Sequence, residues 1–154
     1  MKINQDKIEV AIKALAEISS TFPNGFPNEM KGDISSFGAG IIQAGLLPSV
    51  LFFSEGGKES ESKASGRGDE ATKGRRALLM RTLFKVLELK AAEQNKYSDK
   101  RPLLDYVRQN LKKHETLDDI TEAALALKVA MRAFPFAAKE NKKSDSSTAK
   151  KETK

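Results

Sequence analysis

The densest apolar run in the chain, residues 41–53, constrains the fold more than any other stretch. Gly45 and Pro48 interrupt this run. It is shorter than the roughly 18–20 apolar residues of a membrane span, so it predicts a core segment. Gly45 suits the end of one helix, and Pro48 suits the first turn of the next. A buried strand is the alternative because Val and Phe favour strands, although Pro48 lacks the N–H that a central strand needs. We predict two short helices that meet at Gly45.

The composition indicates an all-α protein. The chain has 154 residues, which suits one domain, and only 6% of them are aromatic, with no Trp. Such a sequence is typical of helices built from Ala and Leu. We therefore predict a compact bundle of about six helices over residues 1–138. The chain has no Cys, which excludes disulfides, thiolate catalysis and thiolate metal sites.

Apolar residues at helical spacing place the remaining helices. The predicted segments are 5–20, about 29–44, 70–94, 102–113, and 116 to about 134. Asn4 is the expected cap of the first segment, and Thr116 is the expected cap of the last. The loop that follows the first helix carries Phe22 and Phe26, which we expect to pack on the core.

Two stretches are predicted to lie outside the packed bundle. Residues 54–74 are rich in Gly, Ser, Lys and Glu and are almost free of apolar residues, which predicts a long mobile loop. Residues 139–154 are a low-complexity, lysine-rich tail that we expect to be disordered.

The positive charge is concentrated in two places. The net charge is +6, and residues 75–92 alone carry +4 while residues 139–154 carry +3. Clustered cations favour an anionic partner such as nucleic acid. Arg75 and Arg76 stand side by side next to the predicted loop, where two guanidinium groups can grip a phosphate. A solvated helix face is the alternative interpretation.

No pattern of catalytic or cofactor-binding residues stands out. His114 is the only histidine, and no partner arrangement for a catalytic base accompanies it. Asp118, Asp119 and Glu122 suggest a metal site, but helix capping and the helix dipole explain them more simply. We expect no enzyme activity, no cofactor and no small-molecule substrate. Because the first residues lead into a charged amphipathic segment, we also expect a cytoplasmic protein with no membrane partner.

Glycines in the second predicted helix indicate close packing. Gly38 and Gly40 each cost up to about 1 kcal/mol relative to Ala in a helix. Such a cost is tolerated where another backbone comes near, within the molecule or from a partner. Gly38, Gly40, Gly45 and Leu46 are therefore the candidate packing residues.

Two stretches resemble a known family. The first is Ile41-Ile42-Gln43-Ala44-Gly45-Leu46 followed by Val50-Leu51-Phe52-Phe53. The second is Thr121-Glu122-Ala123-Ala124-Leu125-Ala126-Leu127-Lys128 followed by Arg132-Ala133-Phe134. Together they resemble the small, all-helical subunit of the Cmr effector complex, which is the type III-B CRISPR–Cas surveillance complex. The resemblance covers about half of the chain, and most of its motifs are apolar.

The resemblance implies a function in antiviral defence. The chain would be a non-catalytic subunit that stacks in several copies as a minor filament and helps to hold target RNA. Its neighbours would be the backbone subunit, the Cas10-type large subunit, further copies of itself, and the crRNA–target complex. Under this hypothesis the RNA-binding candidates are Arg75, Arg76, Arg81 and Lys85, with Lys128 and Arg132 as weaker ones. The alternative is a helical protein–protein adaptor with no direct nucleic-acid role.

Overall fold

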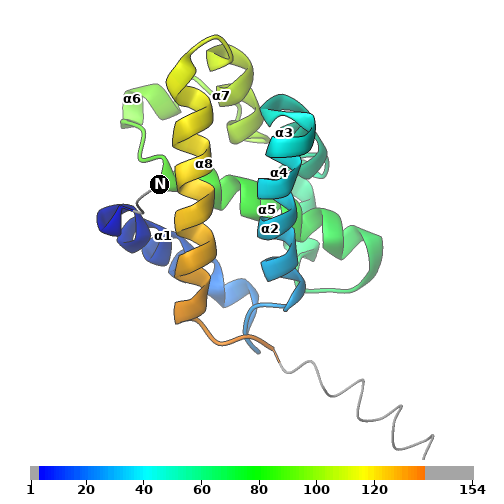
Figure 1. Cartoon of the computed structure of the whole chain (residues 1–154). Helices are drawn as coiled ribbons and strands as arrows, with labels where there is room; N and C mark the ends of the chain where they lie inside the picture. The colour runs from blue at the N-terminus through cyan, green and yellow to red at the C-terminus, as the bar shows by residue number, and fades with distance from the viewer. Residues whose placement is uncertain (1–3, 138–154) are drawn as a thin grey trace, which may run out of the picture.

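A computed structural model describes residues 4–137 of the chain and confirms an all-α bundle (Figure 1). The helices are α1 (Gln5–Ile18), α2 (Glu29–Ala44), α3 (Leu46–Phe53), α4 (Gly57–Ser60), α5 (Gly68–Val86), α6 (Ala91–Gln94), α7 (Pro102–Asn110) and α8 (His114–Ala130). Single 3-10 turns follow α1, α4 and α8, at Ser19–Thr21, Glu61–Lys63 and Met131–Ala133. The lysine-rich tail predicted at 139–154 lies outside the described residues.

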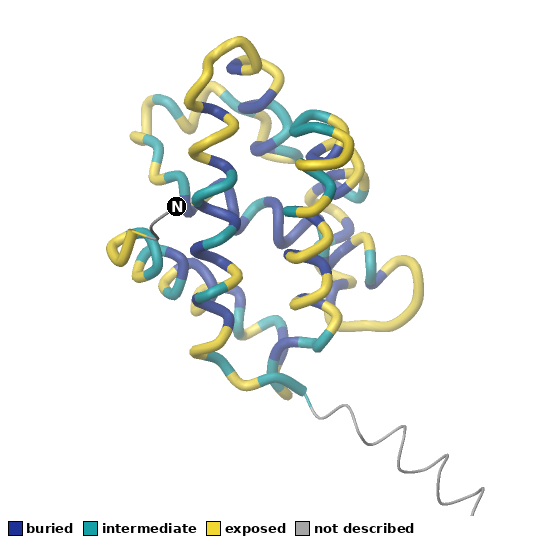
Figure 2. The backbone as a smooth tube through the Cα atoms, in the orientation of Figure 1, coloured by how far each residue is buried: buried dark blue, intermediate teal, exposed yellow. Residues whose placement is uncertain are grey.

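Helix α5 is the centre of the bundle. It packs against α1, α2, α3, α7 and α8, and its backbone is mostly buried (Figure 2). Leu79, Leu83 and Val86 are fully buried. Because neighbours surround the helix, its other faces are buried as well, as Thr82 illustrates. The helix ends at Val86 and not at 94, and the chain turns at Glu88, which has a φ of +56°.

The apolar run at 41–53 forms two helices, as predicted. Gly45 ends α2 with a φ of +102°, a conformation that residues with a side chain rarely adopt, and its N–H donates to the Ile41 carbonyl at 3.0 Å. Pro48 lies in the first turn of α3. The run is only partly core, however. Val50 and Phe53 are buried, whereas Ile42 is 86% exposed and Phe52 is 56% exposed.

The prediction of a loop over residues 54–74 is wrong. This segment contains α4, a 3-10 turn and the first two turns of α5. It packs closely through small residues: Ala64 is fully buried, and a Cβ added to Gly74 would lie 2.2 Å from the Ser60 carbonyl oxygen. Arg101 also holds its start, donating from Nε to the Ser54 carbonyl at 2.8 Å. Residues 54–74 are thus held in place by backbone contacts and hydrogen bonds. Patterns of large apolar side chains in a sequence do not detect such interactions.

The loop between α1 and α2 closes one end of the bundle. Asn4 caps α1 as predicted, accepting a hydrogen bond from the Asp6 N–H at 2.8 Å. Phe22 and Phe26 are both buried, also as predicted. The Phe26 N–H donates to the Pro135 carbonyl at 3.1 Å, and the Ala137 N–H donates to the Phe26 carbonyl at 2.9 Å. This bridge ties the start of α2 to the end of the described chain.

The junction between α7 and α8 differs from the prediction. Helix α7 stops at Asn110 and not at 113, and α8 begins at His114 and not at 116. Thr116 lies inside α8 and is buried, so it is not the cap, and its hydroxyl donates to the Asn110 carbonyl at 2.8 Å. That bond links the start of α8 to the end of α7.

None of the helices in residues 4–137 combines the length and the apolarity that crossing a bilayer requires.

Candidate interaction surfaces

The two adjacent arginines predicted to bind phosphate instead flank a buried carboxylate. Arg75 is only 8% exposed, and its Nε lies 3.7 Å from Oδ2 of Asp33 on α2. Arg76 Nε lies 3.5 Å from the other oxygen, Oδ1. The Arg76 guanidinium also lies over the Phe52 ring, 4.9 Å from its centroid. The cluster joins α2, α3 and α5.

Burial dominates the electrostatics of this cluster. It raises the pKa of Asp33 above the ordinary 3.8, and the two guanidinium groups offset only part of that rise. Asp33 Oδ2, Arg75 Nε and Arg76 Nε have no hydrogen-bond partner, so the attraction is ionic and imperfectly aligned. The accessible edge of Arg75 lines a polar hollow of about 550 Å³ together with Arg67 and Asp69.

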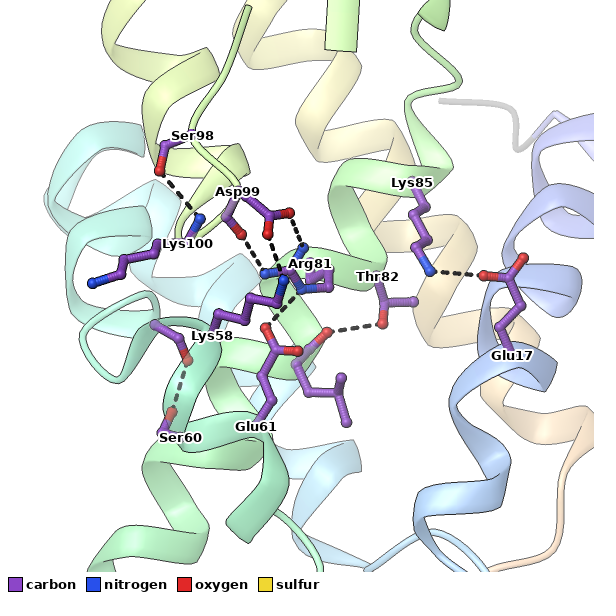
Figure 3. A network of polar contacts seen from close by, with 12 residues as sticks. Glu17, Lys58, Ser60, Glu61, Arg81, Thr82, Lys85, Ser98, Asp99 and Lys100 are labelled. Carbon is purple, nitrogen blue, oxygen red and sulfur yellow. Dashed lines mark hydrogen bonds and ion pairs between the residues drawn. The ribbon is translucent and has the colours of Figure 1, made fainter. Parts of the chain in front are cut away.

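Arg81 belongs to a second polar network, which Figure 3 shows from close by. Its Nε donates to Glu61 Oε2 at 2.7 Å, and its Nη2 donates to the Asp99 carbonyl at 2.6 Å. Lys58 pairs with the carboxylate of Asp99. The network fastens the 3-10 turn after α4 and the turn before α7 to α5. Lys85, one turn further along α5, pairs with Glu17 of α1 at 2.7 Å.

Four of the six predicted RNA-binding residues therefore have a carboxylate partner within the chain. The other two, Lys128 and Arg132, are exposed at the end of α8 and in the turn that continues it. Neither has a carboxylate within 4.0 Å in the described part of the chain. The sequence ranked them as the weaker candidates because it did not reveal the distant acidic partners of the others.

The predicted packing residues divide into two kinds. Gly40 serves the packing of α2 on α3, since a Cβ there would lie 2.8 Å from Ser49 Oγ. Gly45 makes the turn between the same helices, and Leu46 packs on the edge of the core. Gly38 differs, because no atom lies within 4 Å of its added Cβ. Nothing inside the described chain explains a glycine at that point of the helix.

Gly38 opens onto an apolar groove of about 410 Å³ between α2 and α8. The two helices run side by side in Figure 1. One wall is formed by α2 and the other by α8; the residues are Ile34, Ser35, Gly38, Ala39, Ile41, Ile42, Thr121, Ala124, Leu125 and Lys128. Sequence reasoning missed this groove, although Thr121, Leu125 and Lys128 lie on one side of a helix whose other side supplies the core.

No cluster of three or more potential metal ligands occurs in residues 4–137. Asp118, Asp119 and Glu122 lie beyond the first turn of α8, so the prediction that helix capping explains them is wrong. Burial raises the pKa of Asp119 above 3.8.

Residues 4–137 form a single helical bundle with an apolar groove, and within these residues Lys128 and Arg132 at the end of α8 have no ion-pair partner. No protein-family model, no curated protein and no solved structure matches the chain.

Proposed function

We propose that this chain is the small, non-catalytic subunit of a type III-B CRISPR RNA-guided effector complex. It stacks as part of the minor filament and helps to hold target RNA during antiviral defence in the cytoplasm. One observation carries the proposal. The two stretches that resemble the Cmr small subunit are about 80 residues apart in sequence, yet both contribute to one groove: Ile41 and Ile42 of the first stretch lie on its α2 wall, and four residues of the second lie on its α8 wall. If both stretches serve one binding function, they are expected to lie on one surface of the protein.

The contacts to other subunits fall on the face formed by α2 and α3. Ile42, Leu51 and Phe52 are large apolar residues that are at least half exposed there. Burial of exposed apolar side chains against a partner is favourable, so these residues are the candidates for such contacts. The partners are the backbone subunit, the Cas10-type large subunit and further copies of this chain.

The RNA contacts fall first on Lys128 and Arg132, since these cations need not leave an internal partner. Lys85 and Arg81 are secondary candidates because each would exchange a carboxylate at 2.7 Å for a phosphate. Arg75 and Arg76 rank last because Asp33 and burial hold them. Contacts to phosphates give affinity and salt dependence without sequence specificity, which suits a complex in which the guide reads the sequence.

The test is reconstitution with type III-B backbone and large subunits, followed by measurement of target-RNA retention against salt concentration. The double variant Lys128→Ala/Arg132→Ala is expected to flatten the slope of log K against log salt by about 1.4, or about 0.7 per phosphate contact. The matched control is Lys96→Ala/Arg108→Ala, which removes one exposed lysine and one exposed arginine elsewhere. An unchanged slope would exclude the assigned RNA contacts, and failure to enter the complex would exclude the function.

A protein–protein adaptor without a nucleic-acid role is the second candidate. The internal pairing of Arg75, Arg76, Arg81 and Lys85 favours it, because these ion pairs already account for most of the predicted cationic surface. The same reconstitution distinguishes the two: an adaptor stays in the complex after nuclease treatment and leaves RNA retention unaltered when it is omitted.

A further inference from the structure

The exposed side of α8 carries unpaired charges in a symmetric order. Asp118 and Glu122 lie toward its start, and Lys128 and Arg132 lie toward and just beyond its end. None of the four has an ion-pair partner in residues 4–137. Half-buried Leu125 stands midway between them on the groove wall.

The spacing is self-complementary about Leu125. Asp118 precedes Leu125 by seven residues and Arg132 follows it by seven, which is about two helical turns in each direction. Glu122 precedes Leu125 by three residues, and Lys128 follows it by three. When two copies of one helix pack antiparallel about a two-fold axis, each residue faces the residue equally far beyond the axis. An axis at Leu125 therefore brings Asp118 opposite Arg132 and Glu122 opposite Lys128.

The shape of the surface agrees with the charge order. The groove between α2 and α8 is open and apolar, and Gly38 leaves its floor free of a side chain. A helix laid in this groove would cover Leu125 and Thr121 and would lie beside exposed Ile42. Leu117, which is 45% exposed one turn before Thr121, extends the apolar contact. Helix α8 forms one wall of the α2–α8 groove. In a two-fold symmetric dimer, α8 of each copy could therefore occupy the groove of the other copy.

We propose that the free protein forms a two-fold symmetric dimer in which α8 of each copy lies antiparallel in the α2–α8 groove of the other. The contact pairs Glu122 with Lys128 and Asp118 with Arg132 across the axis, with Leu125 meeting its own copy. Such a contact closes after two copies and does not propagate, unlike the repeating contact of a filament. It does not depend on the proposed function. It does cover Lys128 and Arg132, so the dimer and the assigned RNA contacts exclude each other.

The test is sedimentation equilibrium of the full chain without RNA, from low to high micromolar concentration. Wild type is expected to pass from monomer to dimer and no further. Glu122→Lys and Lys128→Glu each turn two attractive pairs into two repulsive ones, which weakens the dimer roughly tenfold. Mixing the two variants restores both pairs in a heterodimer, so the mixture is expected to associate more tightly than either variant alone. The charge change at exposed Lys96→Glu is the control and leaves the dimer unaltered.

A second measurement locates the axis. Because the chain has no Cys, Leu125→Cys introduces a single thiol that is expected to form an intermolecular disulfide under mild oxidation, whereas Lys96→Cys is not. A monomer at every concentration, growth beyond a dimer, or a dimer indifferent to the charge changes would each overturn the proposal. If the reconstituted complex did not retain RNA, the proposed function would be contradicted but the dimer would not. Failure of one proposal is therefore distinguishable from failure of the other.

Discussion

Gly74 and Gly32 lie in helices, and the same substitution is expected to change stability in opposite directions at the two sites. Alanine is favoured over glycine in a helix by about 1 kcal/mol. At exposed Gly32 of α2 nothing lies within 4 Å of the added Cβ, so Gly32→Ala gains that amount in full. At Gly74 of α5 the added Cβ meets three backbone atoms, namely the Ser60 oxygen at 2.2 Å and Ala64 N and Cα at 2.9 and 3.1 Å.

The magnitude at Gly74 follows from which atoms must move. Ordinary contact begins near 3.4 Å, and a backbone carbonyl cannot rotate away as the end of a side chain can. Overpacking of this kind costs about 1–3 kcal/mol, and a contact this short lies at the upper end of that range. After the helix preference is subtracted, Gly74→Ala is expected to lose about 2 kcal/mol. For a chain of this size that lowers Tm by roughly 4–8 °C, whereas Gly32→Ala raises it by roughly 2–4 °C.

Thermal and urea unfolding followed by far-UV circular dichroism measure both changes. Dilute protein should be used, so that association does not contribute to the measured stability. If Gly74→Ala were as stable as Gly32→Ala, α4 would not pack against α5. Residues 54–67 would then belong to the loose loop that composition predicts over 54–74.

Further predictions concern the polar networks and the ordered segment. Replacing residues 55–66 with a short Gly/Ser linker is expected to lower the urea midpoint strongly, because it removes Ala64 and Glu61 from α5; a neutral result would mean that these contacts contribute nothing. Glu61→Gln leaves the partly buried Arg81 without its nearest carboxylate and is expected to cost about 1–2 kcal/mol in urea unfolding. In contrast, Glu70→Gln at the exposed pair with Lys63 is expected to cost less than about 0.5 kcal/mol. Because burial raises the pKa of Asp33 in the folded state, the folded protein holds that proton more tightly than the unfolded chain does. The free energy of unfolding of the wild type, compared with that of Asp33→Asn, should therefore fall as pH rises above about 3.8. A rise of this difference over the same pH range would mean that the two guanidinium groups outweigh burial.

The sequence revealed the elements whose signals are local. Asn4, Gly45, Pro48 and the buried Phe22 were all placed correctly because a cap, a positive φ, a helix start and an aromatic anchor each depend on a few neighbouring residues. The all-α class followed from helical spacing in the same way.

What sequence reasoning missed depends on contacts between distant residues. Asp33 precedes Arg75 by 42 positions, and Glu17 precedes Lys85 by 68, so a cluster of cations appeared free when its partners lay elsewhere. Residues 54–67 lack large apolar side chains, and they are held by backbone packing against Gly74 and by Arg101, which no hydrophobic pattern detects. The α2–α8 groove likewise exists only once the two helices are side by side.

The central position of α5 has a consequence for a severed chain. The exposed turn Ser65–Arg67 separates a part that contains α1 to α4 from a part that contains α5 to α8. Helix α5 packs against α1, α2, α3 and α4 from the first part, so neither part covers its apolar surface alone. Two separately produced fragments, divided at this turn, should therefore find each other in solution and rebuild the bundle without a covalent link. The turn at the entrance to the central helix is therefore the place where we expect the chain to tolerate division.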